Sequence, residues 1–355
     1  MNRGFWDNLK KPIIGLAPMD GVTDPAFRYM VASVSKPAVM FTEFVNVEGL
    51  ARGVEKMLPA FFYSAKERPV VAQLFGTETD SFYKAAVMLC YLGFDGIDIN
   101  MGCPVSKIAS KGAGAALIKN PKLAKKIIKS VYKGINDFAN GISLENAGVH
   151  ENIISFVKKN KDMFGGKNGV VAKNSDRKLI PLSVKTRIGY DEICAEQWAK
   201  LLISFGVKTL TMHGRTLKQL YSGEANWEVL GNVAKICKEN DVMFFANGDI
   251  SSLEDAHEKI KKYGCDGVLI GRATNGNPWF FEGKEPSLED RLNVIKKHVK
   301  YFEKLSYLPF QTLKKHLAWY TKGFDGAKEM RMSFMQAQSG KDVYDVIDEF
   351  SRKIK

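Results

Sequence analysis

The stretch Asp98-Ile99-Asn100-Met101-Gly102-Cys103-Pro104 joins strand-forming residues to a tight turn. Residues 94–100 favour a β-strand, and Gly102 and Pro104 favour a turn that presents the thiol of Cys103. Small residues at 112–116 follow, so a flat ring could approach that thiol closely. A strand that ends in such a turn is typical of the catalytic end of an α/β barrel. Taken alone, the stretch also fits an inert buried cysteine beside turn-forming residues.

Seven other apolar, β-branched runs accompany this strand, and helical patterns separate most of them. Continuous apolar strands that alternate with amphipathic helices indicate a parallel sheet buried on both faces. Eight such units predict an α/β fold, a closed (β/α)8 TIM barrel, with a doubly wound open sheet as the alternative. The predicted strands are Ile13–Met19, Val39–Phe44, Val70–Phe75, Gly96–Asn100, Leu182–Arg187, Thr209–His213, Val242–Asn247 and Gly267–Gly271.

The helical patterns define the rest of the domain organisation. Helices are predicted over Thr79–Leu92, Pro121–Lys133 and Ala195–Phe205, and a capped helix start at Ser251–Glu254. Residues 134–180 are Gly- and Asn-rich and too long for an ordinary connection, so we expect an insertion, with a helix over Glu151–Phe164 and a mobile remainder. The barrel is predicted to span residues 1–283, and the helical spacing after it predicts a small all-helical C-terminal domain over residues 287–355.

The charge distribution points to a polyanionic partner. The 355-residue chain has a net charge of +13. Residues 104–180 carry 15 Lys or Arg against 5 Asp or Glu, and residues 287–355 carry 14 against 9. Nucleic acid is the natural partner for such a surface, and a merely solvated basic face is the alternative.

Cysteine usage and hydropathy exclude several classes of protein. The five cysteines are odd in number and lack a CxxC pair, so neither a zinc site nor a disulfide framework is expected, and we predict no metal. No apolar run reaches the roughly 18 residues that span a membrane. Residues 1–11 contain no apolar signal segment, so we expect a cytoplasmic protein that binds no membrane.

The ends of the predicted strands carry polar groups, and in a barrel these ends meet at one mouth. Glycines and an arginine after the last two strands suit a phosphate, while Lys185 and His213 could hold an anionic ring or a phosphate. Gln73 and Asn100 offer both donors and acceptors, which suits the edge of a heterocycle. The sequence therefore predicts a site for a phosphorylated flat cofactor beside a thiol. The groups, in order, are Ala17–Asp20, Thr42-Glu43, Gln73, Asn100 with Cys103, Lys185 with Arg187, His213 with Arg215, Asn247–Asp249 and Gly271-Arg272.

These motifs together resemble the flavin-dependent tRNA-dihydrouridine synthases. The resemblance spans residues 13–281 in family order, and residues 315–320 look like the family's helical domain. Two features depart from the pattern: Asp20 stands where one branch of the family has a small residue, and the insertion at 134–180 is unusually long. The matching motifs are residues 17–24, 98–104, 184–187, 213–216, Tyr221–Gly223, 247–249, 270–273 and 276–279.

The resemblance implies a reaction and a set of site residues. The reaction would reduce the C5=C6 bond of a uridine in tRNA, with hydride from flavin N5 to C6 and a proton from Cys103, the general acid, to C5. FMN would be the cofactor, and NADPH or NADH the reductant. Cofactor contacts are implied for Pro18, Met19, Asp20, Gln73, Lys185, His213, Asn247, Gly248, Asp249, Gly271 and Arg272. Substrate contacts are implied for Asn100, Arg187 and Arg215.

Other functions remain open at this point. A flavin-dependent barrel dehydrogenase acting on free pyrimidines would use similar chemistry, but the basic insertion and tail favour tRNA over a small substrate. A non-catalytic RNA-binding barrel protein would use the charge without the thiol. A phosphate-sugar barrel enzyme without flavin would give the Cys103 turn no role.

Overall fold

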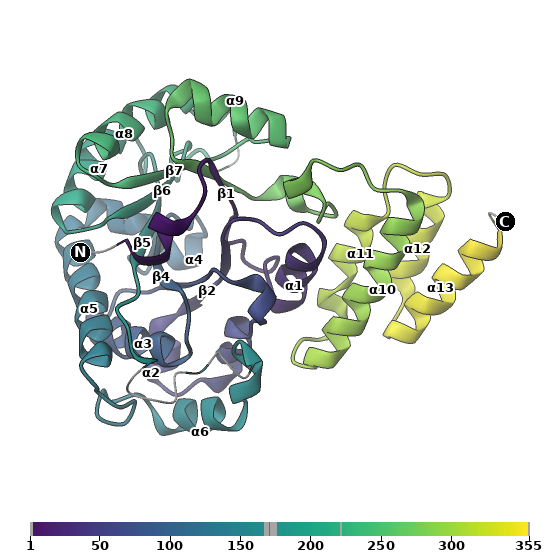
Figure 1. Ribbon diagram of the computed structural model, residues 1–355, viewed down its shortest axis with the longest axis horizontal. Helices are drawn as coiled ribbons and strands as arrows, with labels where there is room; N and C mark the ends of the chain where they lie inside the picture. The colour runs from purple at the N-terminus through teal and green to yellow at the C-terminus, as the bar shows by residue number, and fades with distance from the viewer. Residues whose placement is uncertain (1–2, 167–169, 171–175, 221, 354–355) are drawn as a thin grey trace.

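The computed structural model describes residues 3–166, 170, 176–220 and 222–353. Its eight parallel strands form a closed barrel in chain order (Figure 1). Because β1 pairs with β8 as well as with β2, the sheet has no open edge, which confirms the TIM barrel and excludes the doubly wound alternative. The strands are β1 (Ile13–Leu16), β2 (Met40–Asn46), β3 (Val70–Phe75), β4 (Gly96–Met101), β5 (Leu182–Arg187), β6 (Thr209–His213), β7 (Met243–Asn247) and β8 (Gly267–Ile270).

Two strands end two or more residues away from the predicted position, and β4 and β8 end one residue away. β1 stops at Leu16 because Met19 begins a turn, where its carbonyl accepts the backbone N–H groups of Val22 and Thr23. β2 continues to Asn46, with a register shift against β3 between Phe41 and Phe44. The end of β1 is therefore a rigid turn, and β2 is irregular, at the end of the barrel where the site lies.

Helices surround the barrel and follow most of the strands. The predicted helix over Pro121–Lys133 extends to Ala139, past Gly134. A Cβ at Gly134 would lie 2.7 Å from the Tyr83 carbonyl oxygen, so this glycine permits close packing of α5 on α3 instead of ending the helix. The helices are α1 (Pro25–Val34), α2 (Val47–Ala51), α3 (Thr79–Tyr91), α4 (Ser106–Ala109), α5 (Pro121–Ala139), α6 (Glu151–Lys159), α7 (Ala195–Ser204), α8 (Trp227–Glu239) and α9 (Leu253–Tyr263).

The insertion is more ordered than its composition predicts. α6 covers part of the predicted helix, and its Ile153, Ile154 and Val157 are buried. Phe164 is fully buried and pairs with Tyr63 in an isolated β-bridge. Up to residue 166 the segment is thus packed against the barrel, because its scattered apolar side chains are inward-facing. Residues 167–169 and 171–175 of the segment expected to be mobile lie outside the described residues.

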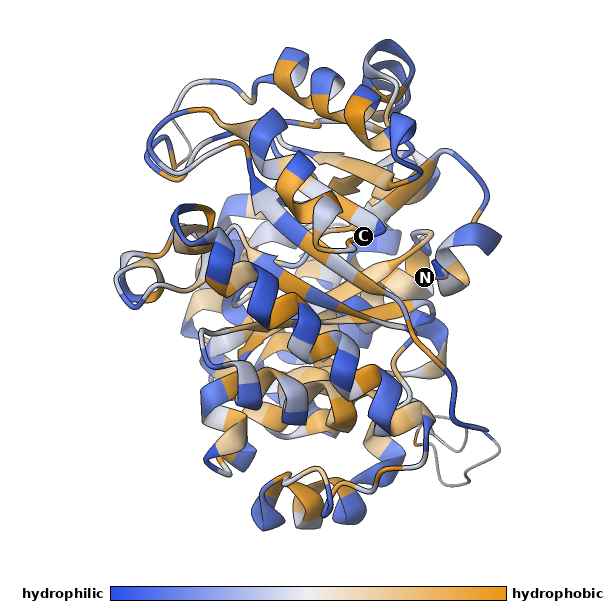
Figure 2. Ribbon diagram, turned by 90° about the vertical axis from the view of Figure 1, so that its left-hand side faces the viewer, coloured by the Kyte–Doolittle hydropathy of each residue, from blue (hydrophilic) through white to orange (hydrophobic). Residues whose placement is uncertain are grey.

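The barrel core closes the end opposite the site. Trp6 is 1% exposed and packs against Phe41 and Phe245, with ring centroids 6.3 and 5.2 Å apart. Figure 2 shows the hydrophobic strands inside a shell of helices that alternate hydrophobic and hydrophilic stretches. The plugged N-terminal end leaves the C-terminal ends of the strands as the open mouth.

The chain after β8 is helical in the described residues, and these helices lie to one side of the barrel (Figure 1). Leu292, Ile295, Val299 and Phe302 are buried, as their spacing predicts. The rings of Tyr29 on α1 and Tyr301 on α10 stack 3.7 Å apart, which ties this unit to the barrel. No helix among the described residues is long and apolar enough to cross a membrane. The four helices are α10 (Leu288–Leu305), α11 (Lys314–Tyr320), α12 (Ala327–Gln336) and α13 (Gly340–Lys353).

Candidate active site

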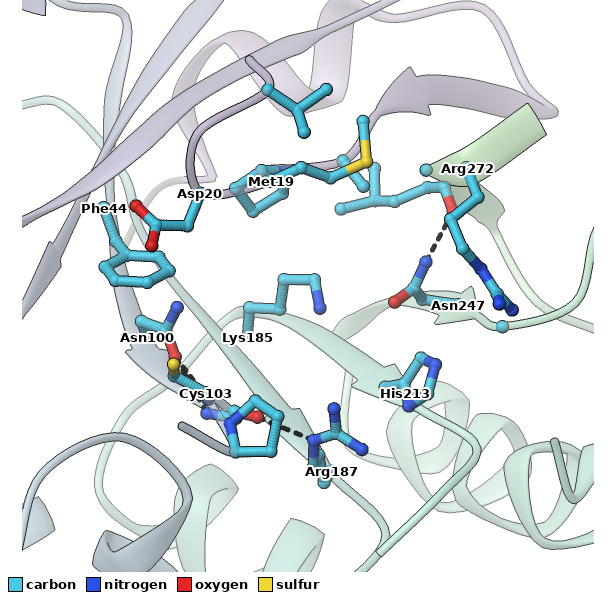
Figure 3. A pocket seen from close by; sticks show the side chains of 18 of the residues that line it. Met19, Asp20, Phe44, Asn100, Cys103, Lys185, Arg187, His213, Asn247 and Arg272 are labelled. Carbon is cyan, nitrogen blue, oxygen red and sulfur yellow. Dashed lines mark hydrogen bonds between the residues drawn. The ribbon is translucent and has the colours of Figure 1, made fainter. Parts of the chain in front are cut away.

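A cavity of about 630 Å³ lies at the C-terminal ends of the strands. It has the size of a small-molecule site and collects side chains from the turn after β1 and from β2 and β4–β8 (Figure 3). Most of the predicted site residues line it: Pro18, Met19, Asp20, Asn100, Cys103, Lys185, Arg187, His213, Asn247, Gly248, Asp249, Gly271 and Arg272. Gln73 and Arg215 do not line it, and Tyr221 lies outside the described residues.

The Cys103 turn is held by the side chain of Asn100. Asn100 Oδ1 accepts the backbone N–H groups of Gly102, at 3.0 Å, and Cys103, at 2.8 Å. Arg187 Nε donates to the Gly102 carbonyl oxygen at 2.7 Å, which fixes the turn from the neighbouring strand. Burial raises the pKa of the Cys103 thiol above its ordinary value, so the thiol keeps its proton at neutral pH.

A buried chain of hydrogen bonds supports Asn100 from the barrel interior. Gln73 Oε1 accepts from Asn100 Nδ2 at 2.9 Å, and Gln73 Nε2 donates to Asp98 Oδ2 at 2.7 Å. The other oxygen of Asp98 accepts from Ser183 Oγ at 2.5 Å. Burial raises the pKa of Asp98 to about 6. In the structure Gln73 thus orients Asn100 from beneath the cavity wall, and the oxygen of Asn100 is committed to the turn.

Cationic groups occupy the centre of the cavity. Lys185 projects into it from β5, and burial, together with the charge of Arg187, lowers the pKa of Lys185 to about 8. Burial and four nearby cationic side chains lower the pKa of His213 well below its usual value, so its ring is neutral. Nδ1 of that ring is buried with no hydrogen-bond partner in the described residues. An unpaired buried donor or acceptor of this kind favours a bound polar group.

The far end of the cavity is shaped by Asp249 and two arginines. The Asp249 carboxylate accepts a bidentate pair from Arg215 at 2.9 and 2.6 Å, and a bond from Arg272 Nη2 at 3.0 Å. Arg215 is 2% exposed and also donates to the Gly223 carbonyl oxygen, so both of its Nη atoms are bonded within the protein. Asp249 thus holds the side chains of Arg215 and Arg272 together at this end of the cavity.

Two glycines line this end of the cavity. A Cβ at Gly248 would lie 2.8 Å from the Ala225 Cβ, and Gly248 has φ +129°, which side chains rarely adopt. A Cβ at Gly271 would lie 3.4 Å from Met19 Sδ, within the cavity wall. Backbone at both positions can therefore approach a bound group closely.

The structure adds residues that motif reasoning missed. Phe44 lines the cavity near Asp20, and Leu220 lines it from the connection after β6. Phe44 directly follows the Thr42-Glu43 strand end, so its position in the sequence could have indicated that it lies at the mouth of the barrel. Nothing in the sequence marks Leu220 as a lining residue. Lys315 of α11 donates to the Gly21 carbonyl oxygen, so the helical unit touches the rim of the cavity.

The chain is similar to known proteins over its whole length. The dihydrouridine synthase family model matches residues 15–139 and 159–355. A probable tRNA-dihydrouridine synthase of Staphylococcus aureus (strain MRSA252) is 32% identical over 365 residues, covering 100% of this chain and 98% of the relative. Probable tRNA-dihydrouridine synthase 2 of Bacillus subtilis (strain 168) is 30% identical over 363 residues, covering 99% and 98%.

Among solved structures, an old yellow enzyme homologue from Zymomonas mobilis is 15% identical, with a TM-score of 0.43, over 78% of this chain and 91% of that one.

The segment 140–158, which lies outside the family match, falls within the insertion and includes most of α6. The family match covers seven of the eight strands entirely, the second half of β1, and all four C-terminal helices. The chain therefore belongs to the dihydrouridine synthase family.

Proposed function

We propose that this protein is a tRNA-dihydrouridine synthase that reduces the C5=C6 bond of a uridine within tRNA, using FMN and either NADPH or NADH. Family membership supports the activity. The observation that carries the proposal is a buried thiol, Cys103, at one end of a cavity whose other end is lined by Arg272 and glycines. We also propose that the protein works in the cytoplasm and that residues 1–283 and 287–355 are its two domains.

The cavity residues fit FMN. Arg272, with Gly248 and Gly271 beside it, would hold the phosphate, because glycine backbone and a guanidinium are both good phosphate donors. Lys185 and the neutral His213 would contact the flavin ring, and the unpartnered Nδ1 of His213 favours such a ligand. The bound flavin would supply the hydride equivalent that uridine reduction requires.

Cys103 would supply the proton. Its raised pKa keeps the Sγ atom protonated, and the Asn100 bonds fix the turn that aims it into the cavity. A positioned acid of this kind contributes about 10²–10⁴ in rate. Once Sγ has given its proton to C5, Lys185 and Arg187 lie near enough to lower the pKa of the thiol and stabilise the thiolate.

The surface around the mouth suits a nucleic acid. Lys107 and Lys111 are exposed and follow the Cys103 turn directly, and Lys315 reaches the rim from α11. A uridine inside folded tRNA must be extruded to enter the cavity, at a cost of a few kcal/mol. Phosphate contacts from these lysines would offset that cost and make binding salt-dependent.

The test uses purified protein, an unmodified tRNA transcript and NADPH, with dihydrouridine measured by mass spectrometry. We expect a yellow protein that forms dihydrouridine in tRNA and much more slowly in free uridine or uracil. Equal rates on tRNA and free uracil would favour the free-pyrimidine dehydrogenase. A colourless protein that binds tRNA without forming product would favour the non-catalytic alternative.

A further inference from the structure

The two ends of the cavity differ in hydrogen-bonding character. At the end shown on the right of Figure 3, His213, Asn247 and Arg272 surround the glycine-lined backbone. At the other end Asp20, Phe44 and Asn100 gather around Cys103. The reacting base must lie at the Cys103 end, because the thiol has to reach its C5 atom. Asp20 is the one carboxylate that lines this end in the described residues.

Asp20 is available to a ligand. Its carboxylate is close to the Gly21 amide and to the charge of Lys315, and no hydrogen bond from another side chain to it is found in the described residues. Asp249, the other carboxylate that lines the cavity, is already occupied by Arg215 and Arg272. Asp20 also lies near enough to Cys103 for its charge to raise the pKa of the thiol.

The turn that carries Asp20 is fixed from three sides. Glu43 Oε1 on β2 accepts the Gly21 N–H at 2.6 Å, and Lys315 of α11 donates to the Gly21 carbonyl oxygen. Thr23 Oγ1 accepts the Met19 N–H at 3.0 Å. A carboxylate on a turn this constrained is preorganised, so little conformational entropy is lost when it binds a ligand.

We propose that Asp20 selects uridine by accepting a hydrogen bond from N3–H of the target base. The inference deepens the proposed function and rests on it. An extruded base is recognised on its Watson–Crick edge, and N3–H is the only donor on that edge of uracil. Cytosine has an unprotonated N3 in the same place, so its lone pair would face the Asp20 carboxylate and be repelled. Asp20 would therefore discriminate between the two pyrimidines whose C5=C6 bonds are otherwise alike.

The test replaces Asp20 with Asn and compares two transcripts that differ only by uridine or cytidine at the target position. Asn can offer its Oδ1 to N3–H of uracil or its amide N–H to N3 of cytosine, so the variant removes both the charge and the bias between the two bases. We expect kcat/KM on the uridine transcript to fall about 10-fold, the difference between a charged and a neutral hydrogen-bond acceptor. The dissociation constants of the oxidised enzyme for the two transcripts should converge in Asp20→Asn.

Asp191→Asn is the matched control. Asp191 is exposed, pairs with Lys119 and does not line the cavity, so this variant makes the same change in net charge outside the site. It should keep wild-type preference for uridine. The inference is overturned if Asp20→Asn keeps that preference, or if it loses FMN instead, which would assign Asp20 to the cofactor. Failure of the wild type to form dihydrouridine would overturn the proposed function itself.

Discussion

Replacing Asn100 with Ala should uncouple the Cys103 turn from the barrel. The substitution removes three hydrogen bonds, two from backbone N–H groups of the turn and one to Gln73, with lengths of 2.8–3.0 Å. At a net of about 1 kcal/mol each, the free energy of unfolding falls by about 3 kcal/mol. With about 2.1 cal/mol/K of unfolding entropy per residue over 355 residues, the melting temperature drops by about 4 °C.

Turnover should fall much more than stability. A displacement of the thiol by about 1 Å costs about 100-fold in rate. FMN content should stay at the wild-type level, because Asn100 supports the turn, and Arg272, which we propose holds the FMN phosphate, lies across the cavity. The assays are thermal melting, flavin absorbance and kcat for dihydrouridine formation in tRNA at a temperature well below both melting points.

Asn120→Ala separates the two effects. Asn120 Oδ1 accepts the Leu123 N–H at the start of α5, so its loss also removes a side chain-to-backbone bond and costs about 1 kcal/mol. Its kcat should stay within about twofold of wild type. Near-wild-type turnover in Asn100→Ala, despite the lower melting temperature, would refute the role assigned to Asn100.

Three further predictions concern the cofactor, tRNA and pH. Arg272→Ala should weaken FMN binding about 10-fold or more by removing a charged phosphate donor, measured as FMN lost on dialysis, and unchanged retention would contradict this. Charge reversal at Lys107 and Lys111 should weaken tRNA binding and reduce the slope of log K against log salt by up to about 2, whereas a slope equal to wild type would exclude both as phosphate contacts. Burial lowers the pKa of His298 to about 3, below its unfolded value near 6.5. The unfolded state therefore binds the extra proton, and His298 reduces the free energy of unfolding by about 1.4 kcal/mol per unit as pH falls below about 6.5. His298→Gln should flatten that fall in denaturant titrations at pH 7.5 and 5, and parallel curves for the two proteins would contradict it.

The strand pattern could be predicted from the sequence because parallel barrel strands are buried on both faces. All eight predicted runs overlap a strand, and those over Val70–Phe75, Leu182–Arg187 and Thr209–His213 have the predicted ends. The predicted ends of strands and helices are wrong where tertiary contacts determine the real ends. The Met19 turn and the close packing at Gly134 depend on partners that local propensity does not contain.

The position of the site could also be predicted from the sequence, but which of its residues line the cavity and which support other residues could not. Strand-end residues meet at one mouth by topology, so most of the predicted site residues line the cavity. Gln73 and Arg215 are polar, as are many residues that line the cavity. Only the structure shows that Gln73 binds Asn100 and Arg215 binds Asp249, and that neither lines the cavity. Lys315 lies almost 300 residues from Gly21 in the chain, so their contact needs the fold itself.

The central claim is that the Cys103 thiol donates the proton to the base. Cys103→Ala, with FMN bound, should be reduced by NADPH at the wild-type rate, and its reduced flavin should then be reoxidised by tRNA at least about 100-fold more slowly than in wild type or Cys194→Ala. Wild-type reoxidation by tRNA in Cys103→Ala, with dihydrouridine formed, would contradict the account.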